Sequence, residues 1–330
     1  MKDVVFYHSK CYDGTMAAAA AKLGLRAGAV YYAITYQKAT AEEFFKKGGP
    51  YEYVKRNGGN LTMYFVDFSP KIEVIAGLRA YGHDVVILDH HKSSQEDLAA
   101  LKEEEGLGLE IHFDMTKSGA RLAWEYFHPH TPVPRLVEYV EDRDLWRWSL
   151  PSTKEAIAWL GVSATTNDPD SYIAALQEFH ESFAENIRAG VYIIKEQNVR
   201  IKEMAERFRY LEIEGFGRGA IVNAPVYPSE VAEYVYENNE VPFVIVYAIT
   251  ADCKVSLSFR SKAGAEHSID VTTLARVFGG GGHRNASGGV TDLGSLHELL
   301  ESSVSSKACS CNPCSGNCGK SSCRKPVSLG

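Results

Sequence analysis

The stretch Val85–His91, which reads VVILDHH, decides the fold of this 330-residue chain. Four apolar residues that favour β-structure follow one another and give way abruptly to an aspartate and two histidines. Strands without polar residues belong to parallel sheets that are covered by helices on both faces. Ligands of such sheets bind beyond the carboxyl ends of the strands, so Asp89, His90 and His91 stand where a functional site is expected.

Two earlier stretches repeat this pattern and place more polar residues at the same edge of the sheet. The apolar run Val4–Tyr7 stops at His8, shortly before Asp13, and the run Leu61–Phe68 contains Asp67 near its end. Helical stretches separate these runs, and strands that alternate with helices indicate an α/β fold with a parallel sheet. We therefore expect these polar side chains to meet.

The remaining pattern predicts further helices and then a second, smaller α/β unit. A helical stretch over 171–208, with few breakers except Gly190, is expected to link the two lobes. The predicted elements are helices at 15–23, at 120–127 with a cap in 116–119, and from 136 into 141–146, followed by a strand at 219–223, a helix at 229–236, a hairpin of 243–250 and 254–259, and a short helix at 271–278.

Composition places the chain among soluble two-domain proteins with a substantial core, because 45% of its residues are hydrophobic and 23% are charged. No apolar run reaches the roughly 20 residues that a membrane span needs. The N-terminus lacks the basic start, apolar stretch and small-residue cleavage site of a secretory signal. We therefore expect a cytoplasmic protein with no membrane partner.

The net charge of −7 hides an asymmetry along the chain. The last 27 residues hold four of the 35 basic residues and none of the 42 acidic ones, which leaves residues 1–303 with 31 basic residues and a net charge of −11. A body this acidic is a poor general binder of long nucleic acid, whose affinity depends on neutralising phosphates. It fits clustered carboxylates that hold cations.

Five of the seven cysteines crowd into the tail at 304–330, so the body has no disulfide framework. The tail consists largely of Ser, Cys, Gly and Pro, and we expect it to be disordered. Its cysteine spacing allows binding of a thiophilic metal as the alternative. The tail cysteines are Cys309, Cys311, Cys314, Cys318 and Cys323.

The polar residues at the strand ends are of the types that hold divalent cations. Alone, the Asp-His-His tripeptide is a weak signal, because strand ends are often polar, and its weight comes from the company it keeps. Hard cations need oxygen ligands, and imidazole suits manganese, iron or zinc. Two such ions can polarise a phosphoryl group and generate hydroxide near neutral pH. The accompanying residues are His8, Cys11, Asp13, Asp67, Asp142 and Asp144.

A second set of candidates lies in the segment 279–289, which reads GGGGHRNASGG. Four consecutive glycines weaken helices and strands, so a plain loop is one interpretation. The other is an anion site, in which the glycine backbone approaches the anion and basic side chains donate hydrogen bonds. For the arginine at the end of the strand before it, a surface salt bridge is the alternative. The candidate residues are Gly280, Gly281, Gly282, His283, Arg284 and Arg260.

Five motifs, in this order along the chain, resemble the DHH phosphoesterase superfamily with a DHHA1 C-terminal domain. The resemblance covers about residues 3–303. It implies a DHH metal-binding domain at 1–170, a helical linker at 171–208, a DHHA1 substrate-binding domain at 209–303 and the tail at 304–330. The motifs are HxxCxDG from His8, VDF around Asp67, DHH from Asp89, DxD from Asp142 before an aromatic residue, and GGGHxxAxG from Gly280.

The resemblance implies a role for each metal-binding motif residue. His8 would bind a first metal, Asp13 a second, and Asp67 would bridge both. His90 would belong to the second site. The implied cofactor is a pair of Mn²⁺ ions per chain, with Mg²⁺, Co²⁺ or Zn²⁺ as alternatives.

Three more residues receive roles in the same way. Asp142 would complete the second metal site, and it is preferred over Asp144 because of its spacing to Trp146. His91 would contact the substrate phosphate or help to protonate the leaving oxygen. Asp89 would orient a histidine from behind.

Cys11 departs from the common family pattern, which has an aspartate four residues after the histidine and another two beyond. Cys11 lies three residues after His8 and is followed by Asp13. If Cys11 takes the place of the first aspartate, a thiolate would bias the site toward zinc or iron. If it is only a small buried residue, the first metal has lost a ligand.

The resemblance favours branches that act on nucleotides, because the glycine motif argues against a pyrophosphatase. We therefore expect a metal-dependent hydrolase that cleaves phosphate mono- or diesters of small nucleotides or short oligonucleotides. The alternatives are a RecJ-like single-strand exonuclease and a catalytically inactive nucleotide-binding protein. A homodimer is a possible assembly.

Overall fold

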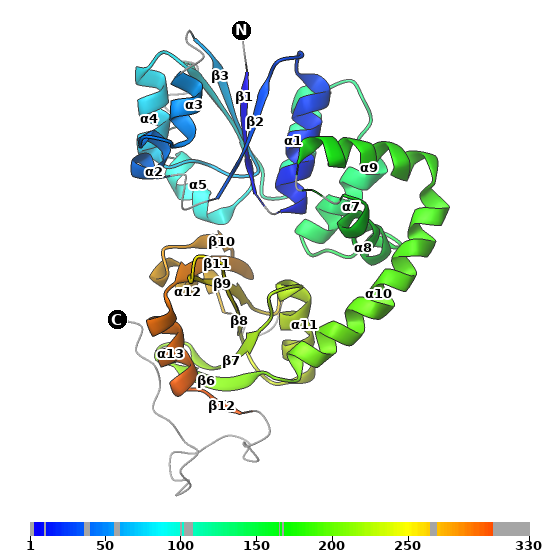
Figure 1. Ribbon diagram of the computed structural model, residues 1–330, viewed down its shortest axis with the longest axis vertical. Coiled ribbons are helices and arrows are strands. Elements are labelled where there is room, and N and C mark those ends of the chain that lie inside the picture. Colours follow the sequence, from blue (N-terminus) through cyan, green and yellow to red (C-terminus); the bar gives the residue numbers. More distant parts are fainter. Residues whose placement is uncertain are drawn as a thin grey trace, which may run out of the picture. The chain divides into compact units, whose positions relative to one another are not determined.

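The computed structural model describes residues 3–9, 11–35, 40–55, 60–99, 101, 108–164, 166, 168–264 and 269–305. The chain divides into two compact units, Met1–Lys195 and Glu196–Gly330, and the division falls within the long helix α10 (Phe183–Ala205). Figure 1 labels the elements of both units. Each unit has its own sheet and its own hydrophobic core, so the predicted α/β class is confirmed.

The first unit is built on a five-stranded sheet with the order β2-β1-β3-β4-β5. All four pairings are parallel, as the apolar runs predict. The strand order reverses at β1, because β2 lies on one side of it and β3 on the other. Such a reversal is where ligands bind in open α/β sheets. The strands are β1 (Val4–His8), β2 (Val30–Ile34), β3 (Thr62–Val66), β4 (Asp84–Asp89) and β5 (Leu109–Phe113).

Helices cover both faces of this sheet, with α2–α5 on one side and α1 with α6–α9 on the other (Figure 1). Side chains alternate along β1, so that Val4 and Phe6 enter one core and Val5 and Tyr7 enter the other. The helices are α1 (Tyr12–Gly24), α2 (Ala41–Phe45), α3 (Pro50–Lys55), α4 (Ile72–Ala80), α5 (Lys92–Ala99), α6 (Gly119–Phe127), α7 (Arg135–Asp144), α8 (Thr153–Ser163) and α9 (Pro169–Glu181).

Two helix starts position the edge where the strands end. Helix α1 follows β1 after a short turn, and its alanines at 17–21 are fully buried, which lets it lie close to the sheet. Helix α6 starts at a cap, as predicted, because the Ser118 hydroxyl accepts a hydrogen bond from the Arg121 N–H at 3.2 Å. The first turns of both helices therefore stand at the carboxyl edge of the sheet.

The helical stretch predicted as a linker consists of two helices, α9 and α10, separated at Ser182. Tyr172, Ala175 and Phe179 of α9 belong to the hydrophobic core of the first unit. The C-terminal end of α10 contributes Ile201 and Ala205 to a core of the second unit. Both ends of the stretch are therefore parts of folded units, which composition alone did not reveal.

The second unit has a seven-stranded mixed sheet with the order β10-β11-β9-β8-β7-β6-β12. The predicted hairpin of β8 and β9 is confirmed, and β7 and β8 form the one parallel pair among the described strands of this sheet. Helices α12 and α13 cover one face, and α11 covers the other. The elements are β6 (Arg209–Ile213), β7 (Gly217–Asn223), α11 (Pro228–Asn238), β8 (Val244–Ile249), β9 (Val255–Arg260), α12 (Val271–Val277), β10 (Gly281–His283), β11 (Ala286–Thr291), α13 (Leu293–Glu301) and β12 (Val304–Ser305).

The start of the predicted disordered tail needs correction. Val304 and Ser305 pair with Tyr210 and Arg209 and so form an edge strand of the sheet. The backbone pairing and the hydrogen bond from Arg209 to the Ser303 hydroxyl at 2.6 Å hold this segment in place. The remaining tail, with its five cysteines, lies outside the described residues.

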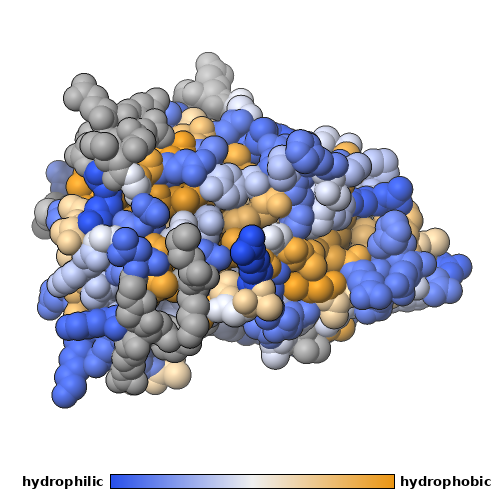
Figure 2. All heavy atoms as spheres, turned by 90° about the horizontal axis from the view of Figure 1, so that it is seen from above, coloured by the Kyte–Doolittle hydropathy of each residue, from blue (hydrophilic) through white to orange (hydrophobic). Residues whose placement is uncertain are grey.

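The described surface carries no long apolar helix. None of the helices in the described ranges has both the length and the apolar character that a membrane span requires. Figure 2 shows one face of the molecule, on which hydrophobic side chains form patches between hydrophilic ones. Individual apolar residues at the surface, such as Tyr192 with an exposed fraction of 72%, are ordinary in soluble domains.

Candidate metal centre

Four of the predicted ligands meet at the carboxyl edge of the first sheet. His8 ends β1, Asp13 lies in the first turn of α1, Asp67 follows β3, and His90 follows β4. The His8 Nδ1 atom lies 3.5 Å from an oxygen of Asp67. The His90 Nε2 atom lies 3.1 Å from the other oxygen of Asp67 and 3.4 Å from Asp13. The reversal of strand order at β1 therefore brings these side chains together.

Asp67 is the centre of the cluster. Its side chain is 1% exposed, and its two oxygens face different histidines, His8 and His90. Its backbone has a φ of 61°, a left-handed conformation that costs about 1–3 kcal/mol for residues other than glycine. A Cβ atom at Gly119 would lie 2.5 Å from that of Asp67, so only glycine fits beside it. The fold thus spends stability to hold this carboxylate between the two histidines.

The cluster forms two groups of potential ligands that share Asp67. The ligand atoms of His8, Cys11 and Asp67 lie within 4.8 Å of one another. The same holds for the ligand atoms of Asp13, Asp67 and His90. Each group alone has only three ligands, and the shared carboxylate makes the arrangement that of a candidate two-ion centre.

The charges in the cluster call for a cation. Burial, with the charges of Asp67 and Asp144, raises the pKa of Asp13 to about 8. Burial opposes protonation of His90, yet the carboxylates around it raise its pKa well above the usual value. An imidazolium therefore sits among three carboxylates, which is the kind of place that a divalent cation takes.

Two carboxylate oxygens in the cluster remain without a hydrogen bond. Asp67 Oδ2 and Asp144 Oδ2 are buried, and neither accepts a hydrogen bond from any residue in the described ranges. Buried carboxylate oxygens are normally hydrogen-bonded or bound to metal. Together with the oxygen and imidazole donor set, this observation fits metal ions at the cluster.

The structure corrects the choice between the two aspartates of α7. Asp144 lies at the cluster, with an oxygen 3.6 Å from His90 Nε2. Asp142, the residue predicted as a ligand, instead accepts hydrogen bonds from the hydroxyls of Ser149 and Thr153 at 2.6 and 2.5 Å. Residues two apart on a helix point about 200° apart, so only one of the pair can face the sheet edge. Asp142 fixes the loop after α7, and Asp144 joins the cluster.

Asp89 and His91 form a buried hydrogen-bonded pair behind the cluster. The Asp89 carboxylate lies 2.7 Å from His91 Nδ1 and accepts the backbone N–H of His90 at 2.7 Å. It also accepts the hydroxyl of Ser69 at 2.6 Å. Sequence analysis missed Ser69, although its place two residues after Asp67 was a usable signal. The role of Asp89 in orienting His91 and the contact of His91 with substrate remain predictions.

Cys11 stands at the N-cap position of α1, next to the cluster. Burial of the thiol, followed by the charges of Asp67 and Asp144, raises its pKa well above the usual value. Without a metal the group is therefore a neutral thiol. Its sulfur lies close enough to His8 and Asp67 to share an ion with them, so a ligand role is sterically open.

The predicted substrate-binding residues gather on the second unit around a tight hairpin. The glycine segment does not form a plain loop, because Gly281–His283 is a strand that pairs with β11. Arg260, at the end of β9, is in register with Ala286, which in turn pairs with His283. The strand register thus places Arg260 beside the hairpin turn that carries Arg284.

The polar contacts at this hairpin are local. The Arg260 guanidinium donates to the Ser229 hydroxyl at 2.9 Å and to the carbonyl oxygen of Ser287 at 3.1 Å. One nitrogen of Arg284 lies 3.7 Å from the carboxylate of Asp270. At least one glycine has a structural reason, since a Cβ atom at Gly280 would lie 1.8 Å from the Gly288 carbonyl oxygen. The anion-binding role of the segment remains a prediction.

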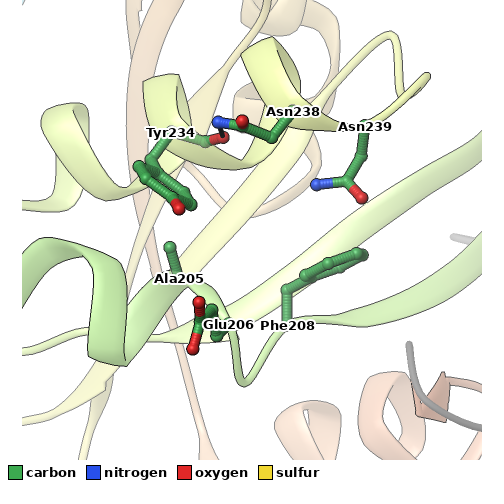
Figure 3. Close-up of a pocket in the computed structure, with 6 residues that line it drawn as sticks. All are labelled: Ala205, Glu206, Phe208, Tyr234, Asn238 and Asn239. Atoms are coloured by element: carbon green, nitrogen blue, oxygen red, sulfur yellow. Dashed lines mark hydrogen bonds between the residues drawn. The ribbon is translucent and has the colours of Figure 1, made fainter.

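A cavity of about 280 Å³ lies elsewhere in the second unit, where α10 and α11 end (Figure 3). Phenyl and phenol rings, two asparagines and one carboxylate line it. None of the predicted site residues takes part. The lining residues are Ala205, Glu206, Phe208, Tyr234, Asn238 and Asn239.

Comparisons with known proteins connect this chain to a family. Residues 228–305 match the family model of the DHHA1 domain. An uncharacterized protein of Acanthamoeba polyphaga mimivirus is 27% identical over 299 residues, which cover 87% of this chain and 66% of that protein. Oligoribonuclease NrnB of Bacillus subtilis is 24% identical over 270 residues, which cover 76% of this chain and 64% of that protein. The chain spans just under two thirds of the length of these relatives.

A solved structure extends the likeness to the fold. The DHH domain of a member of the s1p family of ribosomal proteins has a TM-score of 0.51 and 15% sequence identity, covering 91% of this chain and 85% of that one. At this identity the likeness concerns the fold alone. With the DHHA1 match in the second unit, it bears out the resemblance drawn from the five motifs. The chain belongs to the DHH phosphoesterase superfamily and carries a DHHA1 domain.

Proposed function

We propose that this protein is a two-metal phosphohydrolase that cleaves phosphate mono- or diesters of small nucleotides or short oligonucleotides. The observation that carries the proposal is the sharing of Asp67 by two ligand groups, one with His8 and Cys11 and the other with Asp13 and His90. Asp144 adds a carboxylate near His90. We assign two Mn²⁺ ions to these residues, with Mg²⁺, Co²⁺ or Zn²⁺ as alternatives.

The proposed chemistry divides between the ions and the protein. When bound, a pair of such ions supplies hydroxide near neutral pH and neutralises charge on a phosphoryl group. His91 is held by Asp89 at 2.7 Å, and its ring can hold or deliver a proton at the leaving oxygen. Asp13 is itself fixed by the backbone N–H groups of Gly119 and Ala120 at 2.6 and 2.9 Å. The protein thus orients the groups that surround the phosphate.

Small substrates are supported by charge and by likeness. Residues 1–303 carry a net charge of −11, from 31 basic and 42 acidic residues, which disfavours long polyanions. The Bacillus subtilis relative is an oligoribonuclease. In this proposal the first unit holds the metals, and Arg260, His283 and Arg284 of the second unit bind the substrate.

One assay with Mn²⁺ separates the proposal from its two rivals. The substrates are adenosine 3′,5′-bisphosphate, a 5′-phosphorylated dinucleotide, cyclic dinucleotides, RNAs of two to five residues, long single-stranded DNA and pyrophosphate. Hydrolysis of the short substrates with little action on long DNA is expected. Preferred digestion of long DNA would favour the exonuclease rival. Tight binding without turnover in any metal would identify an inactive nucleotide-binding protein.

A further inference from the structure

The segment 145–152, which joins α7 to α8, carries two tryptophans that no hydrophobic core of the described residues includes. We call it the tryptophan loop. Trp146 and Trp148 are half-buried, whereas Trp124 and Trp159 are buried in the core of the first unit. The two loop rings contact each other edge to face, with centroids 4.8 Å apart and an interplanar angle of 74°. Their placement therefore needs an explanation other than core packing.

The tryptophan loop is firmly anchored at its base. Asp142 accepts four hydrogen bonds from it: two from Ser149 at 2.9 and 2.6 Å, one from the Leu150 N–H at 3.2 Å and one from Thr153 at 2.5 Å. The Tyr139 hydroxyl donates to the carbonyl oxygen of Pro151 at 2.9 Å. These contacts hold the backbone in place independently of the indole rings.

The conformation of the tryptophan loop has a cost. Trp146, Trp148 and Ser152 have φ values of 54°, 52° and 67°, and they are three of the six non-glycine residues in the described ranges with left-handed backbones. Bulky residues rarely adopt this conformation. The Trp148 Nε1 atom is also buried without a hydrogen-bond acceptor among the described residues. Costs of this kind gather at functional sites, where neighbouring structure enforces them.

The tryptophan loop begins at the metal cluster. Asp144, whose oxygen lies 3.6 Å from His90, precedes Trp146 by two residues. The Lys154 ammonium lies 5.0 Å from the ring centroid of Trp148 and adds a positive charge at the same place. An aromatic pair with a cation, next to a site for phosphate chemistry, offers what a nucleobase and its phosphates require.

We propose that Trp146 and Trp148 form a stacking subsite for a nucleobase of the substrate. This inference rests on the proposed function and names the part of the substrate that the first unit recognises. Stacking tolerates every base, because each base has a π-face, so the subsite selects for the presence of a base rather than for its identity. Asp142 is a positioning residue in this assignment, since it acts through the loop that it anchors.

The test compares two substrates with the same phosphates. One is a 5′-phosphorylated diadenylate, and the other is its counterpart without bases. The variants are Trp146→Leu and Trp148→Leu, each beside the conservative Trp→Phe change. Tyr192→Ala is the matched control, because Tyr192 is an exposed aromatic residue with a lysine ammonium 5.3 Å from its ring centroid.

We expect the leucine variants to lose roughly 5- to 150-fold in kcat/KM on the diadenylate, mainly through a higher KM. Their activity on the baseless substrate and their metal content should match those of the wild type. The phenylalanine variants should retain most activity, and Tyr192→Ala all of it. Equal losses on both substrates, or no loss on either, would overturn the subsite. A wild-type protein that hydrolyses neither substrate would instead refute the proposed function, and the subsite with it.

A second measurement does not depend on the leucine variants being folded. Adenosine 5′-monophosphate should quench the indole fluorescence of the wild type when its base stacks. The double variant Trp146→Phe with Trp148→Phe should bind the nucleotide, measured by calorimetry, without this quenching. Unchanged quenching in the double variant would place the base elsewhere and end the proposal.

Discussion

Asp67 is the residue on which the most contacts of the cluster depend. Replacing it by asparagine keeps the size but removes the charge that both ligand groups share. We expect Asp67→Asn to lose metal from both groups and activity by more than the 10- to 100-fold typical of residues that only support a ligand. Elemental analysis and an Mn²⁺ assay measure this. Asp252→Asn, at an exposed site in the second unit, is the control. Two retained metals would contradict the bridging role.

The two aspartates of α7 should separate in opposite ways. Asp144→Asn should reduce metal content and activity with little change in melting temperature, because its carboxylate faces His90. Asp142→Asn should leave an unfavourable contact in a buried network and cost about 1–3 kcal/mol of unfolding free energy. Metal analysis and thermal unfolding of both variants distinguish the roles. The reverse result would reinstate Asp142 as the ligand.

Cys11 tests whether the first ligand group includes a thiolate. If it does, Zn²⁺ should protect Cys11 from alkylation, and Cys11→Ser should weaken zinc binding at that group only. Cys253 is exposed and serves as an internal control that reacts with and without metal. Peptide mapping after alkylation reads both cysteines in one experiment. Equal labelling of Cys11 with and without Zn²⁺ would mean that it only fills space.

The cluster shows what sequence could and could not predict at this scale. Four predicted ligands meet because each follows a strand or opens a helix at one sheet edge, and that edge is visible in the apolar runs. The choice between Asp142 and Asp144 was wrong because it depends on which face of α7 packs inward. Spacing to an aromatic residue does not contain that information, whereas tertiary packing decides it.

At the scale of elements, buried strands were predictable and edge strands were not. The strand at 84–89 is buried along most of its length and reads as one apolar run. By contrast, β2 at 30–34 is an edge strand with mixed exposure, and β5 at 109–113 alternates between buried and exposed residues. Neither presents a continuous apolar run, so the strand order that creates the site could not be derived.

The hairpin of β10 and β11 should affect substrate and not metal. We expect His283→Ala and Arg284→Ala to raise KM for nucleotide substrates while metal content stays at the wild-type level, because the ligand groups of the first unit contain neither residue. Steady-state kinetics and elemental analysis of the same preparations test this. Lys262→Ala, at an exposed ion pair of the same unit, is the control. A fall in metal content would show that the hairpin has been misassigned.

At the scale of the whole molecule, metal should stabilise the fold. A ligand that binds only the native state stabilises it by about 2.7 kcal/mol at one hundred times its dissociation constant. We therefore expect Mn²⁺ to raise the melting temperature of the wild type and a chelator to lower it and abolish activity. Asp67→Asn should show neither shift. Full activity after exhaustive chelation would rule out the metal mechanism.

The order of the ligands along the chain has a consequence for biosynthesis. His8, Asp13, Asp67, His90 and Asp144 come from five separate segments, and three neighbouring strands must pair before they meet. A ribosome will have released most of the first unit before any set of them can hold an ion. Metal therefore enters a finished sheet and cannot guide its assembly, in contrast to small zinc domains that fold around their ion. The ion that the protein carries is then selected by the mature pocket from whatever the cell supplies at that time.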